Sequence, residues 1–204
     1  MFIKLYSDTP NLREIQKVVD VLRNGGIIIY PTDTVYAFGC DITCARALEK
    51  MAWIKNVRPE KATFSFVFYD LSQLSEYTRN ISNQAFKIIK KNLPGPFTFI
   101  LPASNKVPRL LKANRKTLGI RIPNNNIARE IVKELGNPLA TTSVLDDDEI
   151  LEYTTDPELI YEKYCDLVDL VIDGGYGNNN ASTVVDCSGD EIEILRQGIG
   201  ILDE

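Results

Sequence analysis

The chain has 204 residues, a hydrophobic fraction of 44% and a net charge of −5. This length and composition favour one globular domain over residues 1–204, and the acidic charge argues against a protein that coats nucleic acid. No apolar run is long enough to span a bilayer or to form a signal peptide, so we expect a cytosolic protein without membrane contact. Histidine is absent, which excludes Ser-His-Asp and Cys-His nucleophile systems and leaves positioning, cations, hydroxyls, carboxylates and backbone amides for any catalysis.

The first expected helix begins at Thr9 and Pro10, which have the residue types of an N-cap and a first helical position. The apolar residues from Ile15 to Leu22 recur at helical spacing. The helix should end at residues 24–26, Asn-Gly-Gly, where a left-handed backbone is easily adopted. The run IIIY, residues 27–30, then predicts a strand that is buried on both faces.

Helices and strands alternate through the middle of the chain, and strands dominate its last third. Further helices are expected at about 43–54, 83–92, 126–135 and 157–163, and further strands at 64–69, 97–101, 117–122, 139–143, 170–172, 182–186 and 192–195. This order predicts an α/β (α+β) fold, in which helices flank one mixed, strongly twisted sheet.

The segment PTDTVYAFG, residues 31–39, directly follows the buried strand, where α/β folds tend to place binding groups. It offers hydrogen-bonding side chains at Thr32, Asp33, Thr34 and Tyr36. The alternative is a polar turn that only caps the next element. We interpret the segment as the mouth of a nucleotide-sized cleft.

The segment IKNVRPEK, residues 54–61, places Lys55, Arg58 and Lys61 within seven residues. Three cations at this spacing could hold a triphosphate, because Arg binds phosphate through two donors and Lys acts as a point charge. The alternative is a solvated charged loop.

The strand TLGIR, residues 117–121, places Thr117, Gly119 and Arg121 on one face, because side chains alternate along a strand. An arginine among apolar residues needs an anionic partner, which either the protein or a ligand could supply. Hydroxyl side chains stand at the ends of two other strands, in residues 141–143 and 182–183. No Walker A or GxGxxG pattern is present.

The four cysteines include Cys40 and Cys44, whose spacing is compatible with zinc ligands. The other two cysteines lie far away in the sequence, and no histidine could complete the site. We therefore expect buried thiols and no metal site.

Seven short blocks follow one another along the chain: PTDTVYAFG, the cation cluster, PGPFT, TLGIRIP, PLATTS, ASTVVD and ILRQG. In this order they resemble the YrdC/YciO family, and the resemblance covers about residues 12–200. The family includes the threonylcarbamoyl-AMP synthases of tRNA modification. The resemblance implies a twisted α/β domain with a concave, positively charged cleft. It also implies that ATP with Mg²⁺, L-threonine and bicarbonate are used to make threonylcarbamoyl-adenylate for adenosine 37 of tRNA. RNA binding is a further property linked to the family.

The resemblance also implies roles for individual residues, with Lys55 and Arg58 as the catalytic cations. Thr34 matches a threonine-binding hydroxyl, and Arg121 would bind the threonine carboxylate. The implied substrate-binding residues are Thr34, Arg121, Thr142 and Ser182, and the implied nucleotide-binding residues are Lys55, Arg58, Lys61, Thr117, Ser143 and Arg196.

Two departures from the synthases place the chain closer to the YciO branch of the family. The synthases have Lys-x-Arg-Pro, whereas two residues separate Lys55 from Arg58 here. Their Ser-x-Asn becomes Ser143-Val144-Leu145, followed by three aspartates at 146–148. Loss of a hydrogen bond to a charged group costs roughly 1.5–3 kcal/mol. Two hypotheses follow: a threonylcarbamoyl-adenylate synthase, or a paralogue that binds nucleotide or double-stranded RNA with weak or no synthesis.

Overall fold

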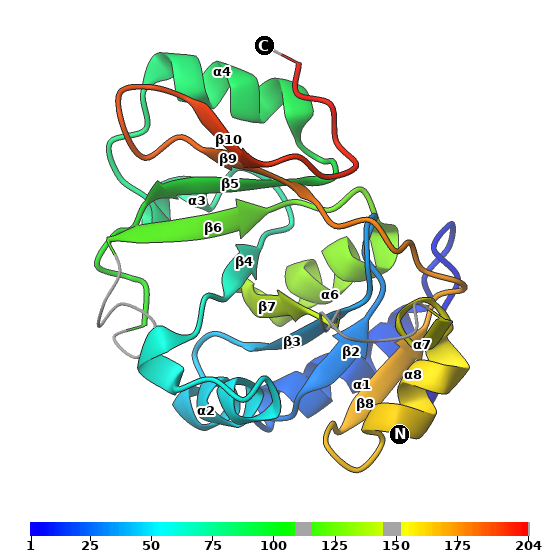
Figure 1. Ribbon diagram of the computed structural model, residues 1–204. Helices are drawn as coiled ribbons and strands as arrows, with labels where there is room; N and C mark the ends of the chain where they lie inside the picture. The colour runs from blue at the N-terminus through cyan, green and yellow to red at the C-terminus, as the bar shows by residue number, and fades with distance from the viewer. Residues whose placement is uncertain (109–115, 145–151, 204) are drawn as a thin grey trace.

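The computed structural model describes residues 1–108, 116–144 and 152–203, with ten strands in one sheet (Figure 1). The strands are β1 (Phe2–Lys4), β2 (Ile28–Tyr30), β3 (Ala37–Asp41), β4 (Ser65–Val67), β5 (Phe97–Pro102), β6 (Thr117–Arg121), β7 (Leu139–Ser143), β8 (Leu170–Asp173), β9 (Thr183–Asp186) and β10 (Glu193–Arg196). The helices are α1 (Leu12–Arg23), α2 (Ala45–Ile54), the 3₁₀ turn η1 (Pro59–Lys61), α3 (Leu74–Tyr77), α4 (Asn83–Asn92), α6 (Asn126–Leu135), α7 (Glu152–Thr155) and α8 (Pro157–Tyr164).

The sheet is mixed, with the strand order β1-β8-β2-β3-β7-β4-β6-β5-β9-β10. The pairs β1–β8, β2–β8, β4–β6 and β5–β9 are parallel, and the other neighbours are antiparallel. The expected architecture, one mixed sheet flanked by helices, is therefore confirmed.

Helix α1 shows how the apolar pattern of the sequence positions an element. Its buried residues include Ile15, Val18, Val19 and Leu22, and the helix packs against α6. The expected start at Thr9 and Pro10 is wrong, because the N-cap is Asn11, whose side chain accepts a hydrogen bond from the amide of Arg13 at 2.9 Å. Asparagine is a stronger N-cap than threonine, so the helix begins two residues later.

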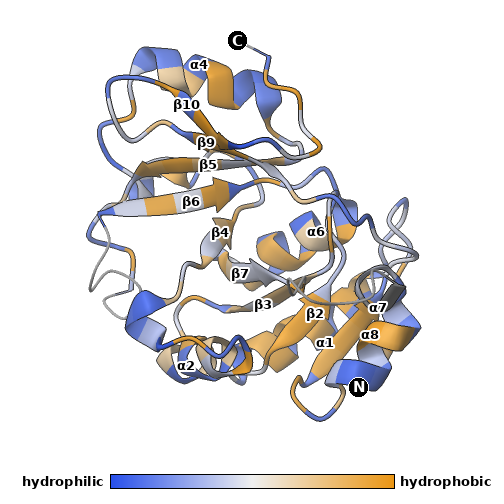
Figure 2. Ribbon diagram, in the orientation of Figure 1, coloured by the Kyte–Doolittle hydropathy of each residue, from blue (hydrophilic) through white to orange (hydrophobic). Residues whose placement is uncertain are grey.

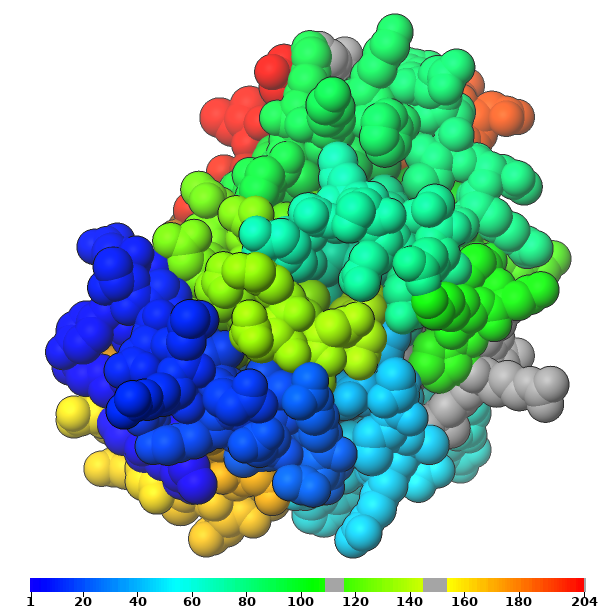
Figure 3. Space-filling view, turned by 180° about the vertical axis from the view of Figure 1, so that it is seen from behind, coloured from blue at the N-terminus to red at the C-terminus, as the bar shows by residue number. Residues whose placement is uncertain are grey.

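Two apolar cores lie on opposite sides of β2, since Ile29 belongs to one of them and Ile28 and Tyr30 belong to the other. One core combines α1 and α6 with β2 and β8, and these two helices lie side by side in the view from behind (Figure 3). The other core takes apolar residues from α2, α3, α4 and α8. Hydropathy follows this arrangement, since the strands are mostly apolar and the outer sides of the helices are polar (Figure 2). Within the described ranges, no helix is long and apolar enough to cross a membrane.

Candidate functional site

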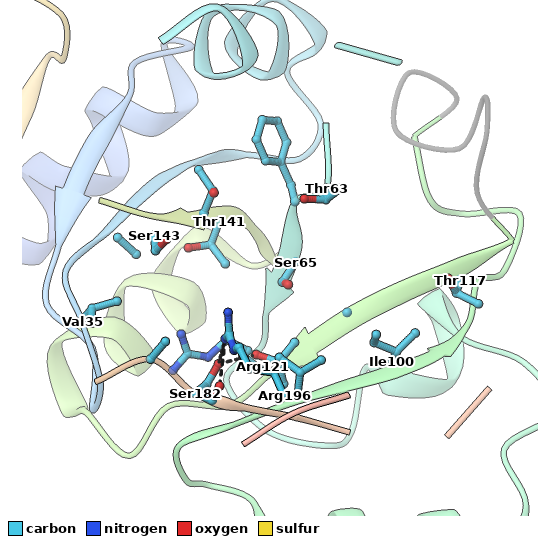
Figure 4. A pocket seen from close by; sticks show the side chains of 17 residues that line it. Val35, Thr63, Ser65, Ile100, Thr117, Arg121, Thr141, Ser143, Ser182 and Arg196 are labelled. Atoms are coloured by element: carbon cyan, nitrogen blue, oxygen red, sulfur yellow. Dashed lines mark hydrogen bonds between the residues drawn. The ribbon is translucent and has the colours of Figure 1, made fainter. Parts of the chain in front are cut away.

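A cavity of about 490 Å³ lies on the sheet (Figure 4). Seven strands that are neighbours in the sheet, from β3 to β10, contribute residues to its lining. Strands of a twisted sheet rotate relative to one another, which hollows one face. The lining is rich in hydroxyl groups, and its only charged members among the described residues are two arginines. It consists of Val35, Ala37, Thr63, Phe64, Ser65, Thr98, Ile100, Thr117, Gly119, Arg121, Thr141, Thr142, Ser143, Ala181, Ser182, Val184 and Arg196.

The strand register explains why these residues meet. On β6, Thr117, Gly119 and Arg121 line the cavity, whereas Leu118 and Ile120 belong to the apolar core. The face predicted from the alternation along this strand is therefore the cavity face. Thr117 and Arg121 stand about 13 Å apart, from the rise of ~3.3 Å per residue along a strand.

Six of the site residues predicted from the sequence line the cavity: Thr117, Arg121, Thr142, Ser143, Ser182 and Arg196. Figure 4 shows Arg121, Ser182 and Arg196 close together at one end and Thr117 at a distance from them. The cavity therefore has an arginine end, defined by Arg121, Ser182 and Arg196, and a body lined mainly by hydroxyl and small apolar side chains. The roles of these residues stay predictions.

Arg121 is buried at the arginine end, and its anionic partner is Asp33 of the PTDTVY segment. The Nη2 atom of Arg121 donates to Asp33 Oδ1 and to Thr34 Oγ1, both at 3.0 Å. Each side chain of this ion pair is only 9% exposed. The Nε atom of Arg121 is buried and has no hydrogen-bond partner among the described residues. The described residues thus supply one anion for Arg121 and leave its buried Nε unpaired.

Thr34 lies behind the cavity wall and is 1% exposed. It is absent from the cavity lining, and its hydroxyl contacts Arg121 and the hydroxyl of Thr32, the latter at 3.1 Å. From residues 31–39, the lining contains Val35 and Ala37. The segment therefore supports the wall of the cleft and anchors Arg121, rather than forming an open mouth.

The other arginine of this end is held by Ser182. Arg196 Nη2 donates to the carbonyl oxygen of Ser182 at 2.8 Å and lies 3.5 Å from its hydroxyl. The Ser182 hydroxyl also shares a 2.8 Å hydrogen bond with Thr98. These contacts connect β5, β9 and β10 and orient the Arg196 side chain at the cavity.

The predicted cation cluster lies outside the cavity lining. Lys55 is the C-cap of α2 and its Nζ lies 5.9 Å from the ring centroid of Phe38, while Arg58 and Lys61 are exposed in and beside η1. The chain then continues directly into the lining through Thr63. The three cations are thus close to the cavity in the sequence but separate from its wall in this conformation.

Four hydroxyl residues in the lining were not singled out individually from the sequence: Thr63, Ser65, Thr98 and Thr141. Thr141 receives a hydrogen bond from the buried Tyr30 hydroxyl at 2.9 Å and donates to the carbonyl oxygen of Phe38. Burial raises the pKa of Tyr30 to about 12, so the phenol stays protonated. For Ser65, Thr98 and Thr141, a hydroxyl residue within a strand was the only signal in the sequence, and Thr63, which precedes β4, had none.

Magnesium would need oxygen ligands, and nucleotide sites usually provide one or two carboxylates. No carboxylate lines the described part of the cavity, so these residues do not fit a protein-held Mg²⁺ ion. Leu145 and the aspartates at 146–148 lie outside the described residues.

A family model described as "Telomere recombination", which covers Sua5, YciO and YrdC, matches residues 20–198. The chain is 40% identical over 201 residues to the uncharacterized protein YciO of Escherichia coli K12, covering 98% of this chain and 96% of that protein. The crystal structure of E. coli YciO superposes with a TM-score of 0.90 over 98% of this chain and 97% of that one.

More distant similarity reaches proteins with a named activity. A threonylcarbamoyl-AMP synthase of Halorhodospira halophila is 33% identical over 122 residues, which are 60% of this chain and 63% of that protein. The crystal structure of P. abyssi Sua5 in complex with L-threonine has a TM-score of 0.86 and 25% identity, and the match covers 97% of this chain and 57% of that one. The chain belongs to the Sua5/YciO/YrdC family.

Proposed function

We propose that the cavity binds L-threonine and ATP and forms threonylcarbamoyl-adenylate from them and bicarbonate, for modification of adenosine 37 in tRNA. The observation that carries this proposal is the buried Arg121, which lines the cavity and whose Nε donor has no hydrogen-bond partner in the described part of the chain. An unpaired buried donor is disfavoured unless a ligand or water satisfies it. A carboxylate is the ligand that arginine binds best, through two parallel hydrogen bonds.

The resemblance to Sua5 supports threonine as the carboxylate, because that protein is described in complex with L-threonine. In the proposed site, Arg121 binds the carboxylate at the arginine end of the cavity, and the Ser182 hydroxyl lies beside it. The amino group of threonine then attacks the carbon of bicarbonate, and water leaves as the carbamate forms. One carbamate oxygen attacks the α-phosphorus of ATP, and the bond to pyrophosphate breaks.

Because the chain has no histidine, the protein contributes by alignment and by charge rather than through an imidazole base. Arg196 lies next to the proposed carboxylate site and would neutralise charge that develops on the carbamate or the phosphate. The cations Lys55, Arg58 and Lys61 precede the cavity wall and would bind the outer phosphates, provided that their loop reaches over the ligand. Alignment of two bound reactants can account for a large part of the rate acceleration that an enzyme provides.

The deciding experiment is growth complementation of a strain that lacks its own synthase. The wild-type gene should restore growth and the Arg121→Ala variant should not. In a purified assay, pyrophosphate release should require both L-threonine and bicarbonate. Pyrophosphate release that is independent of threonine, together with failed complementation, would refute the synthase proposal.

A second function is favoured by the position of the cation cluster. Lys55, Arg58 and Lys61 lie outside the cavity lining, and their spacing departs from that of the synthases. A paralogue that binds nucleotide or double-stranded RNA with little synthesis would fit this arrangement. A gel shift with double-stranded RNA at physiological salt tests this alternative, since phosphate contacts by Lys and Arg make the affinity fall with salt. Binding no stronger than that of a neutral control protein would exclude the RNA function.

A further inference from the structure

Asp33 contacts the arginine end of the cavity without belonging to the cavity lining. Its Oδ1 atom accepts the hydrogen bond from Arg121, and its Oδ2 atom accepts one from the backbone amide of Asn124 at 2.9 Å. One carboxylate therefore connects the loop after β2 with β6 and with the turn that precedes α6. Both sides of the ion pair are buried, so solvent screens it little.

Asp33 and Thr34 together occupy one nitrogen of Arg121. Nη2 has two protons, and the two acceptors at 3.0 Å match them. Nε and Nη1 have no hydrogen-bond partner among the described residues, and of these two only Nε is sealed from solvent. The guanidinium is thus held at one corner through Nη2, Nε is enclosed, and Nη1 is the donor that stays open toward the cavity.

This arrangement needs an external restraint. A buried Nε without a partner disfavours the observed orientation of Arg121 by itself, and a long arginine side chain has other rotamers to which it could move. The contacts at Nη2 are the polar contacts that the described structure provides against this tendency. Of the two acceptors, only Asp33 carries a charge, and its second carboxylate oxygen is held by the amide of Asn124.

We propose that Asp33 is a positioning residue, which holds Nη2 of Arg121 so that the open Nη1 donor faces the carboxylate of the ligand. The identity of that ligand as an amino acid rests on the proposed function, whereas the restraint on Arg121 does not. A group that is oriented before binding loses less freedom when the ligand arrives, which increases affinity.

The test compares Asp33→Asn with Asp33→Ala. Asparagine keeps an oxygen that can accept from Nη2 and removes the charge, whereas alanine removes both. The first measurement needs no ligand: the ¹⁵Nε–¹H signal of Arg121, assigned by its loss in Arg121→Lys. This signal should exchange with water at a similar rate in the wild type and in Asp33→Asn, and about tenfold faster or more in Asp33→Ala, because a broken hydrogen bond frees the side chain.

The second measurement is the calorimetric Kd for L-threonine and, separately, for ATP. For L-threonine, Asp33→Ala should raise Kd about tenfold and Asp33→Asn by less than about threefold, as expected when orientation rather than charge is lost. The Kd for ATP should stay unchanged in both variants. Circular dichroism checks folding, and Asp33→Ser, whose hydroxyl is too short to reach Nη2, replaces the alanine variant if that variant does not fold.

Unchanged Nε–H exchange in Asp33→Ala would overturn the proposal, since Arg121 would then hold its orientation unaided. Equal losses in Asp33→Asn and Asp33→Ala would also overturn it, because charge and not the hydrogen bond would be responsible. If the wild type binds no L-threonine, the proposed function fails, while the exchange measurement still decides whether Asp33 restrains Arg121.

Discussion

Gly198 lies just after β10 and packs against the segment that enters β9, next to the arginine end of the cavity. A Cβ atom at this position would stand 2.3 Å from the carbonyl oxygen of Ala181 and 2.4 and 2.5 Å from the carbonyl carbon and oxygen of Ser182. The Gly198 amide also donates to the buried Thr183 hydroxyl at 3.0 Å. Because the crowded atoms belong to the backbone, no change of rotamer can relieve the contact.

The substitution Gly198→Ala should therefore be strongly destabilising. Insertion of a methyl group into a packed region typically costs about 1–3 kcal/mol. Optimal contacts lie at about 3.5–4.0 Å, so three backbone atoms within 2.5 Å indicate the upper end, about 3 kcal/mol. For a domain of this length, this change corresponds to a decrease in Tm of about 6–12 °C.

Urea unfolding measures this loss directly, with Gly189→Ala as the matched control. A Cβ at Gly189 would meet nothing within 4 Å, so the control should stay within about 0.5 kcal/mol of the wild type. Gly198→Ala should also weaken the binding of both L-threonine and ATP. The reason is that the 2.8 Å hydrogen bond from Arg196 to the Ser182 carbonyl joins the same two segments that the new Cβ would push apart. Equal stability of the two alanine variants would refute the reasoning.

Three further predictions concern the site. Thr34→Val replaces a hydroxyl acceptor of Arg121 by a methyl group. It should lower the free energy of unfolding in urea by about 1–3 kcal/mol, as for a buried donor left unpaired. A stability equal to that of the wild type would show that water replaces the hydroxyl. The pKa of Tyr30 is raised from 10.0 to about 12, so between these pH values the unfolded state loses a proton that the folded state keeps, and stability falls as pH rises. This fall should be steeper in the wild type than in Tyr30→Phe, by up to about 1.4 kcal/mol per pH unit, and parallel curves would contradict the shift. Arg58→Ala should raise the calorimetric Kd for ATP about tenfold, because one hydrogen bond to a charged group is lost. The Kd for L-threonine should stay unchanged. An unchanged ATP affinity would exclude Arg58 from the nucleotide site.

Local chemistry made several elements predictable. The alternation along residues 117–121 placed Thr117, Gly119 and Arg121 on one face, because the pleat of a strand fixes this period regardless of its neighbours. The apolar stripe of α1 was equally readable, whereas its first residue was not. Thr9 and Asn11 both have the residue type of an N-cap, and asparagine, the stronger cap of the two, begins the helix.

The partner of Arg121 shows where local rules end. Asp33 was visible in the sequence as a polar residue, and Arg121 as a cation that needs an anion. They are 88 residues apart, and only the folded sheet brings them to 3.0 Å. The same holds for Ser65 and Thr141, which become part of the cavity because β4 lies between β7 and β6.

By itself, the sequence determined the alternation of elements, the cavity-facing side of β6 and the family, because these depend on periodicity and on the order of short blocks along the chain. Only the tertiary structure decided that PTDTVYAFG supports the cavity wall, that Thr34 is buried behind it and that Lys55 and Arg58 lie outside its lining. These positions depend on strand order and register, which are set by packing between residues far apart in the chain.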